Sequence, residues 1–288
     1  MTRIAITGAS GFLGTKLVRQ FQEQGHTVFG TYNNHPREGL FPVDITDPDA
    51  LSSFFRTVRP DVTIHTAALA DPDVCEENPE MAEAINVDGT QNVVAACKRY
   101  RSKLVYISTN GVFDGITGNY SEEDPPRPLN VYGRTKVAAE EVALKFSALI
   151  LRFDILYGYN GSAAPNGFFD SVIQADNYPV MSNQQRQPLL VDDVGTAIQS
   201  LLNHNASGIY HLAGTTIVSK YDLGIALEQL VRPGQNSHLR PIEQEKKIAP
   251  RPKNTTLDTS KALTAGVRFH SLEEGLALVR EQYNSRNI

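Results

Sequence analysis

The fold of this chain is decided by residues 3–14, RIAITGASGFLG. Arg3 to Thr7 is a short, mostly apolar run with two isoleucines, which predicts a buried strand. Gly8, Gly11 and Gly14 follow it, and apolar residues resume at helical spacing from Leu13. Strand, glycine turn and helix in this order are typical of the first βα unit of a dinucleotide-binding fold.

The glycines of this turn have a physical purpose. The turn takes backbone conformations that a side chain would forbid, and the helix that follows points its N–H groups at a pyrophosphate. An ordinary βα turn is the alternative for such a motif alone, but the flanking strand and helix favour the binding turn. The residues of the turn that we expect to bind the dinucleotide are Gly8, Ser10, Gly11, Phe12 and Leu13.

The end of the second predicted strand, residues 27–31, bears on the choice of cofactor. An acidic residue usually stands there to bind the adenosine ribose. This chain reads TYNNHPR over residues 31–37, and its first carboxylate, Glu38, comes later. Arg37 could pair with a 2′-phosphate through its forked donors, or it could be a surface arginine in a loop. The sequence therefore favours NADP over NAD and leaves the role of Arg37 open.

Strand-like runs alternate with helix-like patterns along the chain. The predicted strands cover residues 3–7, 27–31, 62–66, 104–108, 149–153 and 208–212, and the predicted helices include residues 50–58, 81–100, 191–202, 220–230 and 272–283. Apolar strands joined by helices predict an α/β fold with a doubly wound parallel sheet of Rossmann type. We expect residues 1–157 to form mainly the dinucleotide-binding domain. Residues 158–288 would form mainly a small C-terminal substrate-binding lobe, interleaved with the first domain and carrying a polar loop at 182–188.

Charge and apolar patterning disfavour two kinds of partner, nucleic acid and membrane. The formal net charge of −5 and the absence of a Lys/Arg-rich run disfavour nucleic acid. No apolar stretch has the length of a membrane span, and the first strand begins without a signal peptide, which predicts a cytoplasmic protein that binds no membrane.

The cysteines and histidines show no pattern of metal ligands. Cys75 and Cys97 lack metal-ligand spacing, so we expect reduced, structural thiols and no metal site. His65 and His211 lie in apolar strand contexts, and we interpret them as packed residues rather than catalytic ones.

A second motif supplies candidate chemistry. Tyr132 and Lys136 stand four residues apart, so a helix would place both side chains on one face. An ammonium beside a phenol makes the phenol easier to ionise. Such a pair occurs by chance in many helices, but here Ser108 and Thr109 lie upstream at the end of a predicted strand, in a chain that begins with a dinucleotide-binding turn.

With these motifs the chain resembles the extended short-chain dehydrogenase/reductase superfamily. Within it the chain is similar to the dTDP-4-dehydrorhamnose reductase family, which also contains the regulatory beta subunit of methionine adenosyltransferase. The likeness covers nearly the whole length and rests on HTAA at 65–68, NVDGT at 86–90, STNGVFDG at 108–115, PLNVYG at 128–133 and RPKN at 251–254.

The resemblance implies roles for particular residues. Thr109 would hydrogen-bond the substrate carbonyl, Tyr132 would donate a proton to it, and Lys136 would lower the pKa of the tyrosine and hold the nicotinamide ribose. Asn86 would support the site from a neighbouring helix, and Asn86 and Tyr132 would also take part in binding the cofactor. The residues that would line the cofactor are Gly8, Gly11, Phe12, Leu13, Asp44, Ile45, Ala67 and Ala68.

The resemblance also implies an activity, the NAD(P)H-dependent reduction of the 4-keto group of a nucleotide-linked deoxysugar. It further implies that the protein could form a homodimer. The alternative is an NADP-binding regulatory subunit without its own turnover.

Two departures from the pattern of the family bear on the substrate. Asn110 and Gly111 replace the aspartate and tyrosine common after the threonine, and the loop signature Gln-x-Gly-x-Pro-Thr is only partly kept as QQRQPL at 184–189.

Overall fold

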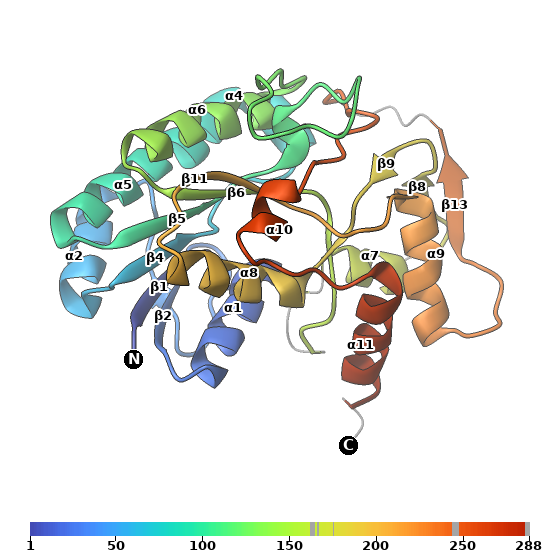
Figure 1. Ribbon diagram of the computed structural model, residues 1–288, viewed down its shortest axis with the longest axis horizontal. Helices are drawn as coiled ribbons and strands as arrows, with labels where there is room; N and C mark the ends of the chain where they lie inside the picture. The colour runs from blue at the N-terminus through green and yellow to red at the C-terminus, as the bar shows by residue number, and fades with distance from the viewer. Residues whose placement is uncertain (162–164, 166, 175, 244–247, 286–288) are drawn as a thin grey trace.

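A parallel sheet of seven strands forms the centre of the protein in a computed structural model that describes residues 1–161, 165, 167–174, 176–243 and 248–285 (Figure 1). In sheet order the strands are β11 (Gly208–Leu212), β6 (Leu149–Phe153), β5 (Lys103–Ile107), β4 (Val62–His65), β1 (Arg3–Thr7), β2 (Thr27–Tyr32) and β3 (Phe41–Pro42). The chain order reverses between β1 and β4, and ligands of such sheets bind at that switch point, beyond the carboxyl ends of the strands.

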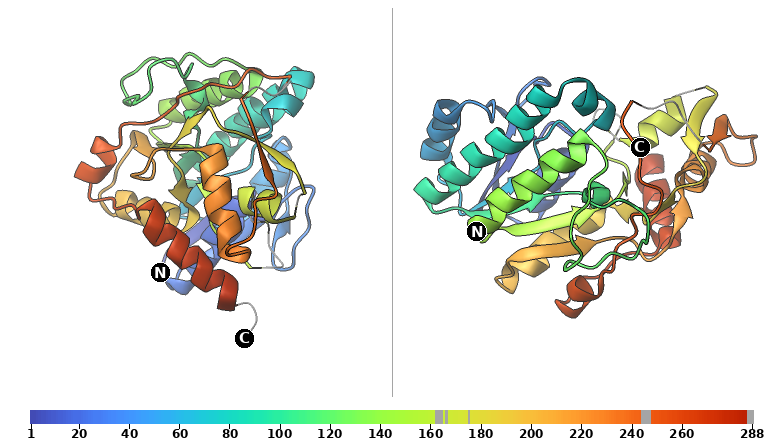
Figure 2. Two further views of the ribbon diagram at one scale, coloured as in Figure 1. Left: turned by 90° about the vertical axis from the view of Figure 1, so that its right-hand side faces the viewer. Right: turned by 90° about the horizontal axis from the view of Figure 1, so that it is seen from above.

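Helices cover both faces of this sheet, which confirms the predicted doubly wound α/β fold (Figures 1 and 2). One face packs on α1 (Phe12–Glu23), α8 (Val191–Asn203) and α10 (Ser260–Thr264), in a core that includes Ile6, Leu17 and Ile198. The other face packs on α2 (Pro48–Val58), α5 (Gly89–Tyr100) and α6 (Val131–Lys145), around Phe55 and Val93.

A smaller cluster of elements stands beside the sheet, on the right of Figure 1. Its core joins buried aromatic and aliphatic side chains such as Phe169, Leu227 and Tyr283. Its helices are α7 (Phe168–Gln174), α9 (Lys220–Val231) and α11 (Leu272–Asn284), and its strand pairs are β8 (Tyr178–Met181) with β13 (Leu239–Ile242), β9 (Gln185–Arg186) with β12 (Val218–Ser219), and β7 (Leu156–Tyr157) with β10 (Leu189–Leu190).

The segment of residues 248–258 connects this cluster to the loop after β5. The Tyr120 backbone N–H donates to the Thr256 carbonyl at 2.9 Å, and the Asp258 N–H donates to the Tyr120 carbonyl at 2.7 Å. On its other side, the Gln185 N–H donates to the Lys253 carbonyl at 2.8 Å. Residues more than a hundred positions apart in the sequence are thereby brought to the same edge of the sheet.

Two predicted elements differ from the structure. The polar loop at 182–188 contains strand β9, because Arg186 and Gln185 pair antiparallel with Val218 and Ser219. The single helix predicted over 81–100 is three segments, α4 (Pro79–Glu83), a π-helical turn η1 (Ala84–Asp88) and α5, preceded by the short helix α3 (Pro72–Glu77). A π-turn inserts one residue into the helical repeat, which hydrophobic spacing alone does not reveal.

Candidate active site

A cavity of about 360 Å³ lies at the carboxyl ends of β1, β4, β5 and β6. We call it the catalytic cavity. Its lining residues are Gly8, Gly11, Phe12, Leu13, Gly14, Thr66, Ala68, Ala70, Ile107, Ser108, Thr109, Tyr132, Lys136, Phe153, Asp154 and Leu156. It therefore brings the glycine turn together with the threonine, tyrosine and lysine that the sequence singled out.

The glycine turn is built by close contacts of backbone. Gly8 has φ +68°, a left-handed conformation, and a Cβ there would lie 2.8 Å from the Ala67 backbone. A Cβ at Gly14 would collide with the Gly8 carbonyl oxygen and lie 2.6 Å from the Ala9 Cα. Among the described residues, no side chain caps the first turn of α1, and that turn holds no acidic residue. This cradle fits the pyrophosphate of a dinucleotide.

Tyr132 is delivered to the cavity by the first turn of α6. The Asn130 side chain caps that helix by accepting from the Gly133 N–H at 2.8 Å, and its amide donates to the Pro250 carbonyl at 2.8 Å. A Cβ at Gly133 would lie 2.5 Å from the Gly111 carbonyl oxygen. A glycine at this position therefore lets the helix start approach the segment that carries Thr109.

The side chains of Thr109 and Tyr132 lie close together in the lining of the catalytic cavity. Burial raises the pKa of Tyr132 to about 12, and the Thr109 hydrogen bond opposes that rise. Desolvation of the phenolate thus outweighs its favourable contacts in this arrangement, and the expected lowering of this pKa by Lys136 stays a prediction. Tyr132 is consequently fully protonated at neutral pH.

Lys136 is buried against β5. Its ammonium donates to the Ile107 carbonyl at 2.7 Å and lies 4.2 Å from the centre of the Tyr106 ring. Burial lowers the pKa of Lys136 to about 7, and the charge of Glu140 on the same helix opposes that change. The lysine thus changes charge close to neutral pH.

Six of the residues predicted to bind the cofactor do not line the catalytic cavity, namely Ser10, Arg37, Asp44, Ile45, Ala67 and Asn86. Asp44 caps its own loop, accepting from the Thr46 N–H and hydroxyl at 2.8 Å each. Asn86, in the π-turn, donates to Thr135 Oγ1 at 3.0 Å and to the Leu69 carbonyl at 3.1 Å. Asn86 thus links the loop after β4 to α6, from a neighbouring helix.

Some lining residues are not part of any motif. Asp154 follows the predicted strand at 149–153, and its place at a strand end, where a cofactor would lie, can be read from the sequence. Thr66 was missed, and its position just after β4 is the signal that could have identified it. Phe153 and Leu156 bracket Asp154 and carry no chemical signature in the sequence. Their place in the cavity depends on β6 lying beside β5.

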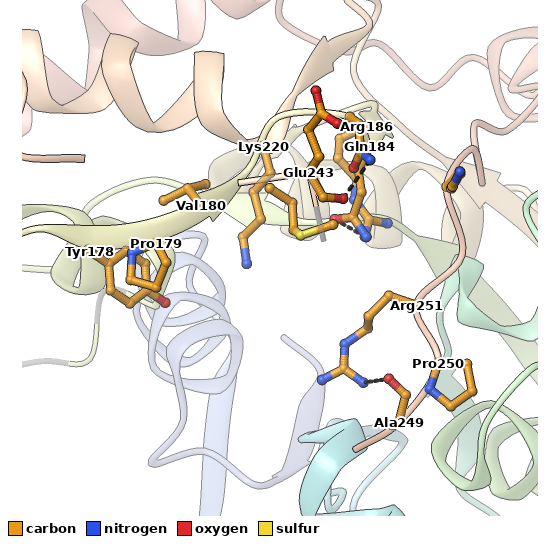
Figure 3. Close-up of a pocket in the computed structure, with 13 residues that line it drawn as sticks. Tyr178, Pro179, Val180, Gln184, Arg186, Lys220, Glu243, Ala249, Pro250 and Arg251 are labelled. Atoms are coloured by element: carbon orange, nitrogen blue, oxygen red, sulfur yellow. Dashed lines mark hydrogen bonds between the residues drawn. The ribbon is translucent and has the colours of Figure 1, made fainter. Parts of the chain in front are cut away.

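A second, larger pocket of about 610 Å³ lies in the smaller cluster of elements (Figure 3). Four basic side chains line it, Arg186, Lys220, Arg251 and Lys253, with Glu243 as the acidic lining residue, and we call it the basic pocket. Arg251 is oriented by Asp73 Oδ2 at 3.0 Å. The basic side chains come from three separated segments of chain, and two of them, Arg186 and Arg251, are ion-paired with Asp154 and Asp73.

Arg186 connects the two pockets. It lines the basic pocket, and its Nη1 lies 3.3 Å from Oδ1 of Asp154, which lines the catalytic cavity. The same nitrogen lies 3.3 Å from Thr255 Oγ1, which accepts from the Asn110 amide at 2.6 Å. The residue next to Thr109 is therefore tied to the basic pocket through Thr255 and Arg186.

Comparison with known proteins shows the family to which this chain belongs. Residues 1–285 match the family described as the RmlD substrate binding domain. The chain belongs to this RmlD family. It is 34% identical to methionine adenosyltransferase 2 subunit beta of Bos taurus over 277 residues, covering 92% of this chain and 83% of that protein. It is 31% identical to a probable low-salt glycan biosynthesis reductase, Agl14, of Haloferax volcanii, covering 97% of each chain.

Solved structures agree with this RmlD family membership. The dTDP-4-dehydrorhamnose reductase of Bacillus anthracis, in complex with NADP, superposes with a TM-score of 0.85 at 27% identity, covering 98% of this chain and 99% of that one. The prediction of an extended short-chain dehydrogenase/reductase, an oxidoreductase that takes a nicotinamide cofactor, is thereby confirmed.

The described residues also bear on membrane spans, metal ligands, cysteines and histidines. In the part of the chain that the structure describes, every helix is too short or too polar to cross a bilayer. Within those same residues, His, Cys, Asp and Glu form no group of three that could hold a metal ion. Cys75 and Cys97 are buried free thiols, and His65 and His211 are buried with hydrogen-bond partners.

Proposed function

We propose that this protein reduces a keto group with NAD(P)H, and that the keto group is the C4 carbonyl of a nucleotide-linked deoxysugar. One observation carries the proposal: Thr109 and Tyr132 share one cavity with Lys136 and with the glycine turn. A bound nicotinamide would supply the hydride. The residues of the chain would bind the carbonyl and complete the proton transfer.

The proposed roles follow from the protonation states. Tyr132 is a protonated phenol at neutral pH, so it can donate to the oxygen of a carbonyl as negative charge develops there. The Thr109 hydroxyl supplies a second hydrogen bond to that oxygen, of a kind typically worth about 3–4 kcal/mol. Lys136, when protonated, would stabilise the resulting phenolate and bind the ribose of the cofactor.

The proposed substrate class is supported by the basic pocket. A diphosphate needs several forked or ammonium donors, and Arg186, Lys220 and Arg251 offer them beside the catalytic cavity. We propose that residues 158–288 supply mainly this substrate-binding side, and residues 1–157 mainly the dinucleotide side. A nucleotide sugar with its diphosphate in the basic pocket could then present its sugar to Tyr132.

We further propose a preference for NADPH over NADH. The loop after β2 carries Arg37 and has no carboxylate before Glu38. A 2′-phosphate would meet a guanidinium there rather than an acid.

The test is an NADPH-oxidation assay with a panel of dTDP- and UDP-linked 4-keto sugars, with NADH in parallel. We expect turnover with at least one 4-keto nucleotide sugar, higher with NADPH, and none with the Tyr132→Phe variant. Turnover that is restricted to sugars without a nucleotide would overturn the substrate class. Binding of NADPH with no turnover on any 4-keto sugar would overturn the reductase.

A second candidate function is a regulatory subunit that binds NADP and another protein. It is favoured by the 34% identity to methionine adenosyltransferase 2 subunit beta, which extends over 92% of this chain. Co-purification with a methionine adenosyltransferase at a constant stoichiometry would support it. The two functions are separated by combining this binding assay with the turnover assay.

A further inference from the structure

A buried ion pair joins α6 to β6 next to the catalytic cavity. The Arg152 guanidinium donates to both carboxylate oxygens of Glu140, with Nε 2.8 Å from Oε1 and Nη2 2.6 Å from Oε2. The two side chains are only 2% and 3% exposed. Arg152 is held further by the Phe113 ring, 5.2 Å away, and by His211 Nε2 at 3.5 Å. This forked pairing fixes the position of the carboxylate.

Glu140 also holds the strand end that carries Thr109. The Ser108 hydroxyl donates to Glu140 Oε1, and the Ser108 backbone N–H donates to the Leu151 carbonyl at 2.7 Å. Because Thr109 is the next residue, the position of its hydroxyl depends on how Ser108 is held.

The same carboxylate lies one helical turn from Lys136. Residues four apart share a face of a helix, and the negative charge of Glu140 favours the charged form of Lys136 against its burial. Arg152 in turn neutralises Glu140. Three buried ionisable groups, Lys136, Glu140 and Arg152, are therefore coupled between α6 and β6.

Other ionisable groups near Lys136 do not change their charge near neutral pH. They are Tyr106 of β5, His65 of β4 and Tyr132 of α6, together with Cys75 of α3, which packs against Tyr132. Burial raises the pKa of Tyr106, that of Cys75 to about 11 and that of Tyr132 to about 12, and it lowers the pKa of His65 to about 3. All four are uncharged at pH 7, so a titration near that pH belongs to Lys136.

We propose that Glu140 is a positioning residue of the active site: held by Arg152, it fixes the Thr109 hydroxyl through Ser108 and sustains the positive charge of Lys136. The role of Glu140 in catalysis rests on the proposed carbonyl reduction. Its electrostatic effect is a property of the protein alone and can be measured without a substrate.

The electrostatic test is an NMR titration of the intact protein labelled with ¹³C at the lysine ε-carbons, with the Lys136 signal assigned through Lys136→Met. In Glu140→Gln, Arg152 and Lys136 remain as two buried cations without the carboxylate. We expect the midpoint of Lys136 to fall by about one pH unit or more. The matched control is Glu141→Gln, which removes an exposed carboxylate from the next position of α6 and should leave the midpoint unchanged. An unchanged midpoint in folded Glu140→Gln overturns the electrostatic role.

Glu140→Asp replaces Glu140→Gln as the test variant if Glu140→Gln does not fold. It keeps the negative charge but moves it back by one methylene, so the Lys136 midpoint should also fall, by a smaller amount. A midpoint that stays unchanged or rises in Glu140→Asp contradicts the proposal.

The geometric test uses Ser108→Ala, which keeps all three charges. We expect an unchanged Lys136 midpoint, a loss of kcat of about tenfold or more, and an unchanged KM. Wild-type kcat in Ser108→Ala overturns the positioning of Thr109. Absence of turnover in the wild type speaks against the proposed function only, because the NMR titration still decides the electrostatic role.

Discussion

The ammonium of Lys136 donates a hydrogen bond to the backbone carbonyl of Ile107 across 2.7 Å. This bond joins α6 to the last residue of β5, two positions before Thr109. It therefore holds the helix that carries Tyr132 against the strand end that carries the threonine, and it makes Lys136 a structural contact as well as a candidate catalytic one.

Tyr132→Phe should abolish carbonyl reduction and leave cofactor binding intact. The phenol is the candidate proton donor, and general acids typically contribute about 10²–10⁴-fold. The ring of Phe fills the same space, so the dissociation constant for NADPH measured by calorimetry should stay within error of the wild type. Wild-type turnover in this variant would show that another group donates the proton.

Lys136→Met should stabilise the protein at pH 6 while impairing cofactor binding and turnover. Burial lowers the pKa of Lys136 from 10.5 to about 7, so between those values the unfolded chain binds a proton that the folded chain releases. In the wild type, burial of the Lys136 charge therefore lowers the free energy of unfolding by its full amount below pH 7. This loss disappears as the pH rises toward 10.5.

Thermal melts from pH 6 to pH 10 measure this effect. The gain in Tm of Lys136→Met over the wild type should be largest at pH 6 and shrink with increasing pH. Lys145→Met, an exposed lysine of the same helix, is the control and should show no such trend. A gain independent of pH would mean that shape rather than charge is responsible.

Acid should destabilise the protein through His211. Burial and the neighbouring Arg152 charge lower its pKa to about 3, whereas the unfolded chain takes up the proton near 6.5. Stability is therefore present above pH 6.5 and is lost as the pH falls toward 3, by up to about 1.4 kcal/mol per pH unit. In urea unfolding at pH 7.5, 6 and 5, the free energy of unfolding should fall less steeply with pH in His211→Gln than in the wild type. The control is His204→Gln, at an exposed histidine, which should behave as the wild type.

Two glycines of the first turn should respond differently to alanine. A Cβ at Gly14 would collide with the Gly8 carbonyl, so Gly14→Ala should lower Tm and weaken NADPH binding. A Cβ at Gly11 would lie 3.4 Å from the same oxygen, an ordinary contact, so Gly11→Ala should keep its Tm and lose only affinity for the dinucleotide. Equal Tm losses in both variants would contradict this distinction.

Arg37→Ala should discriminate the two cofactors. If Arg37 binds the 2′-phosphate, its removal should raise the dissociation constant for NADPH by about tenfold or more and leave that for NADH unchanged. Fluorescence titration with both cofactors measures this. An equal effect on NADPH and NADH would assign Arg37 to the loop rather than to the phosphate.

The sequence alone determined the parts of this protein that are local. The run from Arg3 to Gly14 predicted strand, turn and helix because apolar period and glycine placement act over a few residues, and the predicted strands of the main sheet agree with the structure to within about a residue at each end. The spacing of Tyr132 and Lys136 likewise predicted one helix face. Their catalytic roles stay predictions.

The tertiary structure decided what depends on distant residues. The pairs Glu140–Arg152, Arg186–Asp154 and Asn110–Thr255 join positions 12, 32 and 145 residues apart, and none has a spacing that a periodicity could reveal. Burial also set the direction of the Tyr132 pKa, which the spacing of the pair alone does not reveal. The physical reason is that hydrophobic period and backbone freedom are properties of a segment, whereas desolvation and charge pairing depend on the segments that fold against it.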